Sequence, residues 1–93
     1  MNTYNILNAM NILITGASGF IGFSLSKYLL ELSKKNRIYG IDSLNSYYSL
    51  KLKKKRTNIL NNYKNFEFRK LDISDKKKLY NYLNKKKIDL VIN

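Results

Sequence analysis

The residues best suited to chemistry form one glycine-rich run, Thr15-Gly16-Ala17-Ser18-Gly19-Phe20-Ile21-Gly22. This run follows the apolar stretch Ile12-Leu13-Ile14 and opens a segment in which apolar residues recur with helical spacing. The layout predicts a strand, a tight turn and a helix whose N-terminus faces the turn. Unpaired N–H groups and partial positive charge at a helix N-terminus attract anions, so the chemistry that this run could serve is phosphate binding.

Each glycine of the run has its own predicted task. Gly16 permits the turn off the strand, Gly19 leaves room for a pyrophosphate against the backbone, and Gly22 lets the helix pack close to the sheet. Three glycines are also compatible with a plain turn between packed elements, so their context decides. Asp42 supplies that context, because it ends the next strand-like run close to the roughly 20 residues expected for a ribose-binding carboxylate. Together these features predict a dinucleotide site.

Asp42 also indicates which dinucleotide is bound. A carboxylate at this position can accept both hydroxyls of an adenosine ribose, and it would repel the 2′-phosphate of NADP, so the sequence favours NAD. The alternative is an aspartate that starts an Asx-turn into Ser43. We prefer the ribose role because the glycine run lies upstream.

Composition excludes several classes of function. The 93 residues suit one small domain or part of a larger one, and they include no Cys and no His. Disulfides, thiolate chemistry and imidazole catalysis are therefore excluded, and with the acids spread singly we expect no metal site. No apolar run reaches the roughly 18 residues that cross a membrane. Residues 1–9 lack the pattern of a secretory signal, so we expect a cytoplasmic location and no membrane partner.

The net charge of +12 raises nucleic acid as a partner. The lysines, however, gather in short clusters at the ends or outer parts of predicted helices: Lys53-Lys54-Lys55, Lys76-Lys77-Lys78 and Lys85-Lys86-Lys87. A solvated basic surface accounts for these clusters, so we expect no specific nucleic-acid partner. A basic fragment that binds nucleic acid nonspecifically and in a salt-sensitive way stays open as an alternative.

The hydrophobic spacing predicts alternating strands and helices. Strands are expected over residues 11–15, 38–42, 66–71 and 89–93, and helices over about 20–34, over 50–60 and after the cap residues Ser74 and Asp75. Parallel strands joined by right-handed crossovers then form a Rossmann-like α/β sheet in the order 3-2-1-4. Residues 1–9 would be a short N-terminal extension, and residues 10–93 the N-terminal portion of an NAD-binding domain. The fourth strand would be a bare edge, so we expect the chain to be a fragment.

The same spacing predicts the buried faces of two helices. In the helix that starts at Phe20, the apolar residues expected on one face are Ile21, Leu25, Tyr28, Leu29 and Leu32. Asn36 is expected to close this helix with a positive φ. In the helix over 50–60, the residues expected near one face are Leu52, Arg56, Ile59 and Leu60.

The glycine run, with Asp42 and Leu71-Asp72-Ile73, resembles the N-terminal part of the extended short-chain dehydrogenase/reductase proteins. These are the NAD-dependent nucleotide-sugar epimerases and dehydratases. A narrower stretch, Gly40 to Tyr48 followed by Leu52-Lys53 and Arg56, is similar to the UDP-glucuronate 4-epimerases. The resemblance covers residues 10–93.

The resemblance implies a set of cofactor contacts. The three glycines shape the pyrophosphate turn, and the backbone of Phe20 and Ile21 contacts the phosphates. Asp42 takes the adenosine ribose in a pocket lined by Asn45 and its neighbours, while Asp72 and Ile73 flank the adenine. Family members often carry Asn where this chain has Ser43, which changes one side-chain contact. The implied NAD-binding residues are Gly16, Gly19, Phe20, Ile21, Gly22, Asp42, Ser43, Asn45, Asp72 and Ile73.

The activity implied for the parent is epimerisation of a nucleotide-sugar substrate by transient oxidation at C4. Alternatives are a sugar-nucleotide 4,6-dehydratase, another extended reductase, or an inert dinucleotide-binding module. The family's Y-x-x-x-K motif lies beyond the fourth strand, so we expect no catalytic residue and no epimerase activity in this chain. Two chance matches, Tyr47 to Lys51 and Tyr82 to Lys86, precede the strands that would carry the motif, and we reject both. A homodimeric parent stays open.

Overall fold

The computed structural model describes residues 10–45 and 50–93, so the predicted extension 1–9 lies outside the described residues. Strands and helices alternate along the described chain: β1 (Asn11–Thr15), α2 (Phe20–Leu32), β2 (Arg37–Asp42), α3 (Leu50–Leu60), β3 (Phe66–Lys70), α4 (Lys76–Lys86) and β4 (Leu90–Ile92). The strands pair in parallel in the order β3-β2-β1-β4. The predicted Rossmann-like α/β sheet is confirmed.

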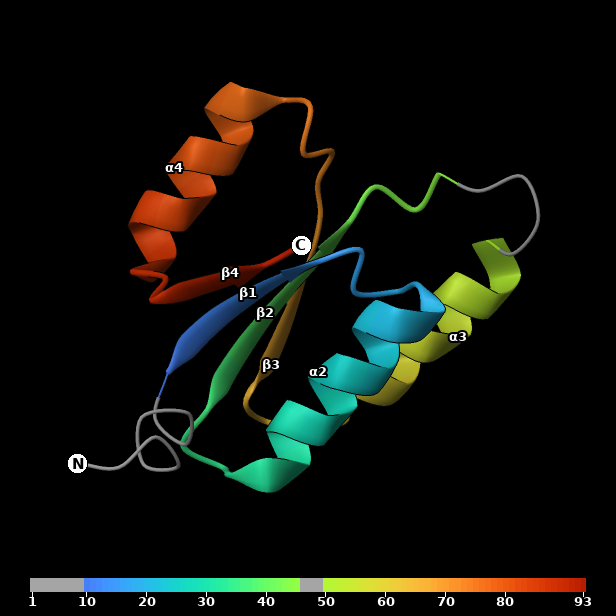
Figure 1. Ribbon diagram of the computed structural model, residues 1–93. Coiled ribbons are helices and arrows are strands. Elements are labelled where there is room, and N and C mark those ends of the chain that lie inside the picture. Colours follow the sequence, from blue (N-terminus) through green and yellow to red (C-terminus); the bar gives the residue numbers. More distant parts are fainter. Residues whose placement is uncertain (1–9, 46–49) are drawn as a thin grey trace.

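The sheet separates two layers of helices. Figure 1 shows α2 and α3 side by side on one face of the sheet and α4 on the other. Because all strands run in one direction, the loops that leave β1 and β2 emerge at the same edge, the carboxyl edge of the sheet (Figure 1). Ligands of open α/β sheets bind at this edge.

Each face of the sheet has its own apolar core. Ile12, Ile14 and Ile38 pack with Leu30 and Leu60 under α2 and α3. On the opposite face, a second core lies under α4 and consists of Leu13, Tyr39, Ile41, Leu71 and Tyr82. Successive residues of a strand point to opposite faces, so burial on both sides explains why the central strands read as nearly continuous apolar runs.

The edge strand β3 is half exposed, and α4 begins at its predicted cap. In β3 the apolar Phe66 and Phe68 are partly buried, and the charged residues between and after them are exposed. Asp75 caps α4, because its carboxylate accepts the N–H of Lys78 at 3.3 Å. Leu79, Tyr82 and Leu83 of this helix pack inward against the sheet. No helix of the described residues has the length and apolarity that a membrane span requires.

The predicted buried face of α2 is partly wrong. Ile21 and Tyr28 are 80% and 62% exposed, whereas Ser26, Leu29 and Leu30 are buried. The inward face of α2 meets the glycine turn as well as the sheet, and small residues are needed there. The buried Ser26 hydroxyl is satisfied within the helix, because it donates to the carbonyl of Gly22 at 2.7 Å.

The prediction that Asn36 closes α2 with a positive φ is also wrong. The helix ends at Leu32, and in the described chain the non-glycine residues with positive φ are Leu44 and Lys87. Asn36 is fully buried and caps α2 with its side chain, because Nδ2 donates to the carbonyl of Leu29 at 3.1 Å. Its Oδ1 accepts the N–H of Met10 at 3.4 Å, which joins the helix end to the start of β1.

Replacement of Asn36 by alanine should destabilise the chain. Asn36→Ala leaves the Leu29 carbonyl without its donor in a buried place, so we expect the free energy of unfolding to fall by roughly 1–3 kcal/mol in urea titrations followed by circular dichroism. Asn62→Ala is the matched control, because Asn62 is exposed. Equal stability of the two variants would contradict the capping role.

Candidate functional site

The glycine turn is held tightly between β1 and α2. Gly16 has a φ of +66°, in the left-handed region, which confirms that a glycine is needed for the turn off the strand. The N–H of Gly19 donates back to the carbonyl of Gly16 at 3.0 Å. The N–H of Ala17 donates to the carbonyl of Ile41 at 3.1 Å, which ties the turn to the end of β2.

Gly22 brings α2 against the turn itself. A Cβ atom at Gly22 would lie 2.2 Å from the carbonyl oxygen of Gly16 and 3.0 Å from the Cα of Ala17. The close approach expected at this position is therefore present, but it is made to the backbone of the turn, whereas the spacing predicted a contact with the sheet. At Gly19 an added Cβ would be 3.3 Å from the same Gly16 oxygen, a milder conflict.

The start of α2 presents backbone donors without acceptors. Gly19 is the N-cap, its carbonyl accepts the N–H of Phe23 at 2.8 Å, and the first turn contains no acidic side chain. Among the described residues, none accepts the N–H groups of Phe20, Ile21 and Gly22. Such donors, together with the helix dipole, are suited to hold an anion at the carboxyl edge of the sheet.

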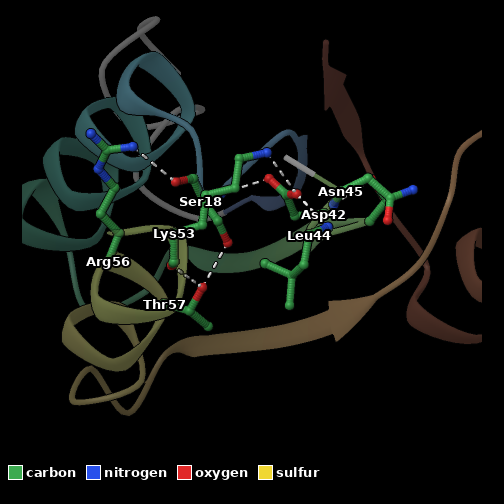
Figure 2. Close-up of polar contacts among 8 residues, drawn as sticks. Ser18, Asp42, Leu44, Asn45, Lys53, Arg56 and Thr57 are labelled. Carbon is green, nitrogen blue, oxygen red and sulfur yellow. Dashed lines mark hydrogen bonds and ion pairs between the residues drawn. The ribbon is translucent and has the colours of Figure 1, made fainter. Parts of the chain in front are cut away.

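Asp42, the last residue of β2, is almost fully buried and connects several segments. Its Oδ2 accepts the N–H of Ser18 at 3.1 Å, and its Oδ1 accepts the N–H of Leu44 at 2.8 Å (Figure 2). Lys53 of α3 places its Nζ 3.3 Å from Oδ1, and the Asp42 side chain is 3% exposed. The bond to Leu44 is the Asx-turn that the sequence left as an alternative, although the bond to Ser18 had no counterpart in the prediction.

The inner face of α3 differs from the predicted one. Leu52 and Ile59 are 45% and 39% exposed, while Thr57 and Leu60 are buried. Arg56 donates from Nη1 to the carbonyl of Ser18 at 3.3 Å, so it faces the turn.

Sequence reasoning missed the part that α3 plays in the site. The signal was available, because Lys53, Arg56 and Thr57 form a polar stripe at helical spacing that continues to the buried Leu60.

The ten predicted cofactor residues lie around three adjoining cavities at the carboxyl edge. The cavity beside the glycine turn measures about 470 Å³, and it shares Gly16 with one of about 190 Å³ beside Asp42. The latter shares Ser43 and Asp72 with a third, of about 330 Å³, that reaches Asn45. The Asn45 side chain points away from Asp42 (Figure 2). A larger cavity of about 890 Å³ lies between Lys34, Arg37, Tyr63 and their neighbours, and none of the ten residues lines it.

Asp72 and Ile73 form an exposed rim of the second cavity. The N–H and the hydroxyl of Ser74 both donate to Oδ1 of Asp72, at 2.9 and 2.8 Å. These two hydrogen bonds hold the pKa of the Asp72 carboxyl below its usual range, so it is ionised at neutral pH. Ile73 is 46% exposed and offers apolar surface beside this charge.

The Tyr82-x-x-x-Lys86 string has the wrong electrostatics for catalysis. Burial raises the pKa of the Tyr82 hydroxyl, and the hydrogen bond that this hydroxyl donates to Glu67 at 2.8 Å raises it further. A catalytic tyrosine needs the opposite shift, which supports the rejection of this match. The other string begins at Tyr47, outside the described residues. Among residues 10–45 and 50–93, no group of three acidic side chains is placed to hold a metal ion.

A family model and a protein sequence match most of this chain. A family model described as GDP-mannose 4,6 dehydratase matches residues 13–93. An uncharacterized protein of Methanocaldococcus jannaschii is 52% identical over 83 residues, which cover 89% of this chain and 26% of that protein.

Two solved structures share the fold. UDP-glucuronic acid 4-epimerase from Bacillus cereus, in complex with UDP-glucuronic acid and NAD, is 34% identical with a TM-score of 0.78; the match covers 89% of this chain and 25% of that one. dTDP-glucose 4,6-dehydratase from Bacillus anthracis, in complex with NAD, is 27% identical with a TM-score of 0.80, over 91% of this chain and 26% of that one. The chain thus spans about a quarter of the length of these relatives.

Replacement of Gly22 by alanine tests the contact between α2 and the turn. Helix propensity favours alanine by up to about 1 kcal/mol, but the clash with the Gly16 carbonyl involves backbone and cannot be relieved by a side-chain rotation. We expect Gly22→Ala to lower the free energy of unfolding by about 1–3 kcal/mol. Ser24→Ala, at an exposed position of the same helix, should be neutral or stabilising. A stabilised Gly22→Ala protein would refute the close packing.

Proposed function

The chain belongs to the GDP-mannose 4,6-dehydratase family of nucleotide-sugar epimerases and dehydratases, and from this premise we propose that residues 10–93 bind NAD for a nucleotide-sugar 4-epimerase of the UDP-glucuronate type. The observation that carries the proposal is the pairing of two features at one edge of the sheet. Unpaired backbone donors at the start of α2 suit a pyrophosphate, and the Asp42 carboxylate lies one hydrogen bond from the same turn.

The proposed roles follow the three cavities. The pyrophosphate lies at the glycine turn, with the N–H groups of Phe20 and Ile21 as donors. The adenosine ribose lies at Asp42, and the adenine lies between Asp72 and Ile73. Ser43 and Asn45 border the ribose and adenine end. When bound, NAD supplies the acceptor and donor of a hydride, which is the chemistry that a transient oxidation of the sugar requires.

Ribose binding requires access to the Asp42 carboxylate, whose side chain is 3% exposed. Both carboxylate oxygens are already engaged, one by the Ser18 N–H and one by the Leu44 N–H and Lys53. Lys53 is the partner most readily displaced, because its ammonium sits on a flexible side chain while the other donors belong to the backbone. A ribose hydroxyl that takes the place of Lys53 keeps the buried carboxylate satisfied.

A second candidate is a sugar-nucleotide 4,6-dehydratase. The description of the family model and the NAD-bound Bacillus anthracis dehydratase favour it as directly as the Bacillus cereus structure favours the epimerase. We place the epimerase first because of the stretch from Gly40 to Arg56. Product analysis with the full-length protein separates the two candidates. UDP-galacturonate formed from UDP-glucuronate supports the epimerase, and a 4-keto-6-deoxy sugar nucleotide formed from dTDP-glucose supports the dehydratase.

Calorimetric titration of the chain with NAD tests the cofactor site. We expect saturable binding that Asp42→Asn weakens roughly tenfold or more, because a charge-assisted hydrogen bond contributes about 1.5–3 kcal/mol. The preference for NAD over NADP should narrow in this variant, because the repulsion of a 2′-phosphate is removed and Lys53 stays nearby.

Asp89→Asn is the matched control for that experiment. The Asp89 carboxylate also accepts a backbone N–H, that of Asn11 at 2.8 Å, but at the opposite edge of the sheet. The proposal fails if NAD does not bind, or if the two variants bind it equally well.

The 93-residue chain itself should not turn over a nucleotide sugar. Incubation with UDP-glucuronate and NAD is expected to give no UDP-galacturonate by chromatography, because the described match to the catalytic motif, Tyr82 to Lys86, has a tyrosine whose pKa is raised by burial and by its hydrogen bond to Glu67. Formation of product well above a blank without protein would contradict this expectation.

A further inference from the structure

We infer that α3 acts as a brace for the phosphate-binding turn, with Thr57 and Arg56 as positioning residues that set cofactor affinity through Ser18. The inference rests on the proposed NAD site and extends it to residues that touch neither phosphate nor ribose in that proposal. Its origin is the environment of Ser18, which lies between Gly16 and Gly19 and is completely buried.

Every polar group of Ser18 is held by a residue from another segment. Its N–H donates to Asp42, its carbonyl accepts Nη1 of Arg56 at 3.3 Å, and its hydroxyl lies 2.6 Å from the hydroxyl of Thr57. Ser18 is therefore held by three contacts, and α3 provides two of them (Figure 2).

The direction of the hydroxyl pair follows from the partners of Thr57. Oγ1 of Thr57 donates to the carbonyl of Lys53 at 2.9 Å, which uses its one hydrogen. Ser18 must then donate to Thr57, and the chain of donors runs from the turn into the backbone of α3. Thr57 is 7% exposed, so water cannot readily replace a lost partner.

The composition of α3 supports a bracing role. A helix that only covers a sheet turns apolar residues inward, yet Leu52 and Ile59 face solvent and the inward positions hold Lys53, Arg56 and Thr57. Leu60 provides the buried apolar contact of this helix. The inner face of α3 is thus complementary to a polar turn.

The brace acts on the donors that would receive a phosphate. The Arg56 bond to the Ser18 carbonyl fixes the planar peptide unit between Ser18 and Gly19. This unit leads directly into Gly19, the N-cap of α2, so it anchors the point from which the first N–H groups of the helix extend. Arg56 adds a second contact, because its guanidinium lies 5.8 Å from the centre of the Phe20 ring. If Ser18 lost these contacts, the N–H groups of Phe20 and Ile21 would adopt a wider range of orientations. They would then point less often at the same anion and would bind it more weakly.

The test compares hydroxyl removal with hydroxyl retention. Thr57→Val keeps the shape of the side chain but removes both hydrogen bonds, whereas Thr57→Ser keeps the hydroxyl. By calorimetry we expect Thr57→Val to bind NAD roughly tenfold more weakly and Thr57→Ser to stay within about twofold of the original chain. Arg56→Met should also weaken binding, with partial recovery in Arg56→Lys, and it serves as the second variant if Thr57→Val does not fold.

Tyr82→Phe separates positioning from stability. It removes a buried hydroxyl that donates to Glu67 under α4, on the far face of the sheet (Figure 1). It should lower the unfolding midpoint in urea but leave NAD affinity within about twofold. If Thr57→Val is folded and binds NAD like the original chain, or if Tyr82→Phe weakens binding as much as Thr57→Val does, the brace is refuted.

Amide NMR in the absence of cofactor distinguishes failure of the brace from failure of the proposed function. Thr57→Val should shift and broaden the amide signals of Gly19, Phe20 and Ile21, whereas Tyr82→Phe should leave them in place. If these shifts occur but NAD does not bind to the original chain, the proposed NAD site is wrong, while the effect of Thr57 on the start of α2 is supported. If NAD binds and these amides are unchanged in Thr57→Val, the brace fails alone.

Discussion

The arrangement of the carboxyl edge depends on one buried charge, the carboxylate of Asp42. An ionised carboxylate removed from water costs several kcal/mol unless its oxygens are satisfied. Its partners here come from the glycine turn, from the loop after β2 and from α3: the N–H of Ser18, the N–H of Leu44 and the ammonium of Lys53. Ser18 lies 24 residues from Asp42 in the chain and Lys53 lies 11 residues from it, and their bonds to one carboxylate join the glycine turn, β2 and α3.

What the sequence predicted well is what local rules control. Strand order follows from alternating strands and helices with parallel crossovers, and Gly16 follows from the positive φ that a tight turn requires. The ten predicted cofactor residues, several of them implied by the family resemblance, line cavities at one edge because the carboxyl ends of parallel strands share that edge.

What the sequence did not predict depends on the neighbour that a helix meets. A helical wheel turns apolar residues toward the core, and this misplaced Tyr28, Leu52 and Ile59, because α2 and α3 face the glycine turn as well as the apolar sheet. The hydrogen bonds between Asn36 and Met10 and between Ser18 and Thr57 join residues far apart in the chain. No periodicity specifies such pairs, since they exist only after the elements have packed.

The positive charges of the described residues fall into two groups with different surroundings. The net charge of +12 is an attribute of the whole surface, and Lys34, Arg37 and Lys64 surround a cavity that none of the predicted site residues line. Two cations at the carboxyl edge differ from these in being engaged: Lys53 pairs with Asp42 and Arg56 donates to Ser18. A cation that contacts a fixed partner has a defined direction, whereas a surface lysine without a partner attracts any polyanion and orients none. Positive charge therefore points to a specific site only where it is held in place by contacts.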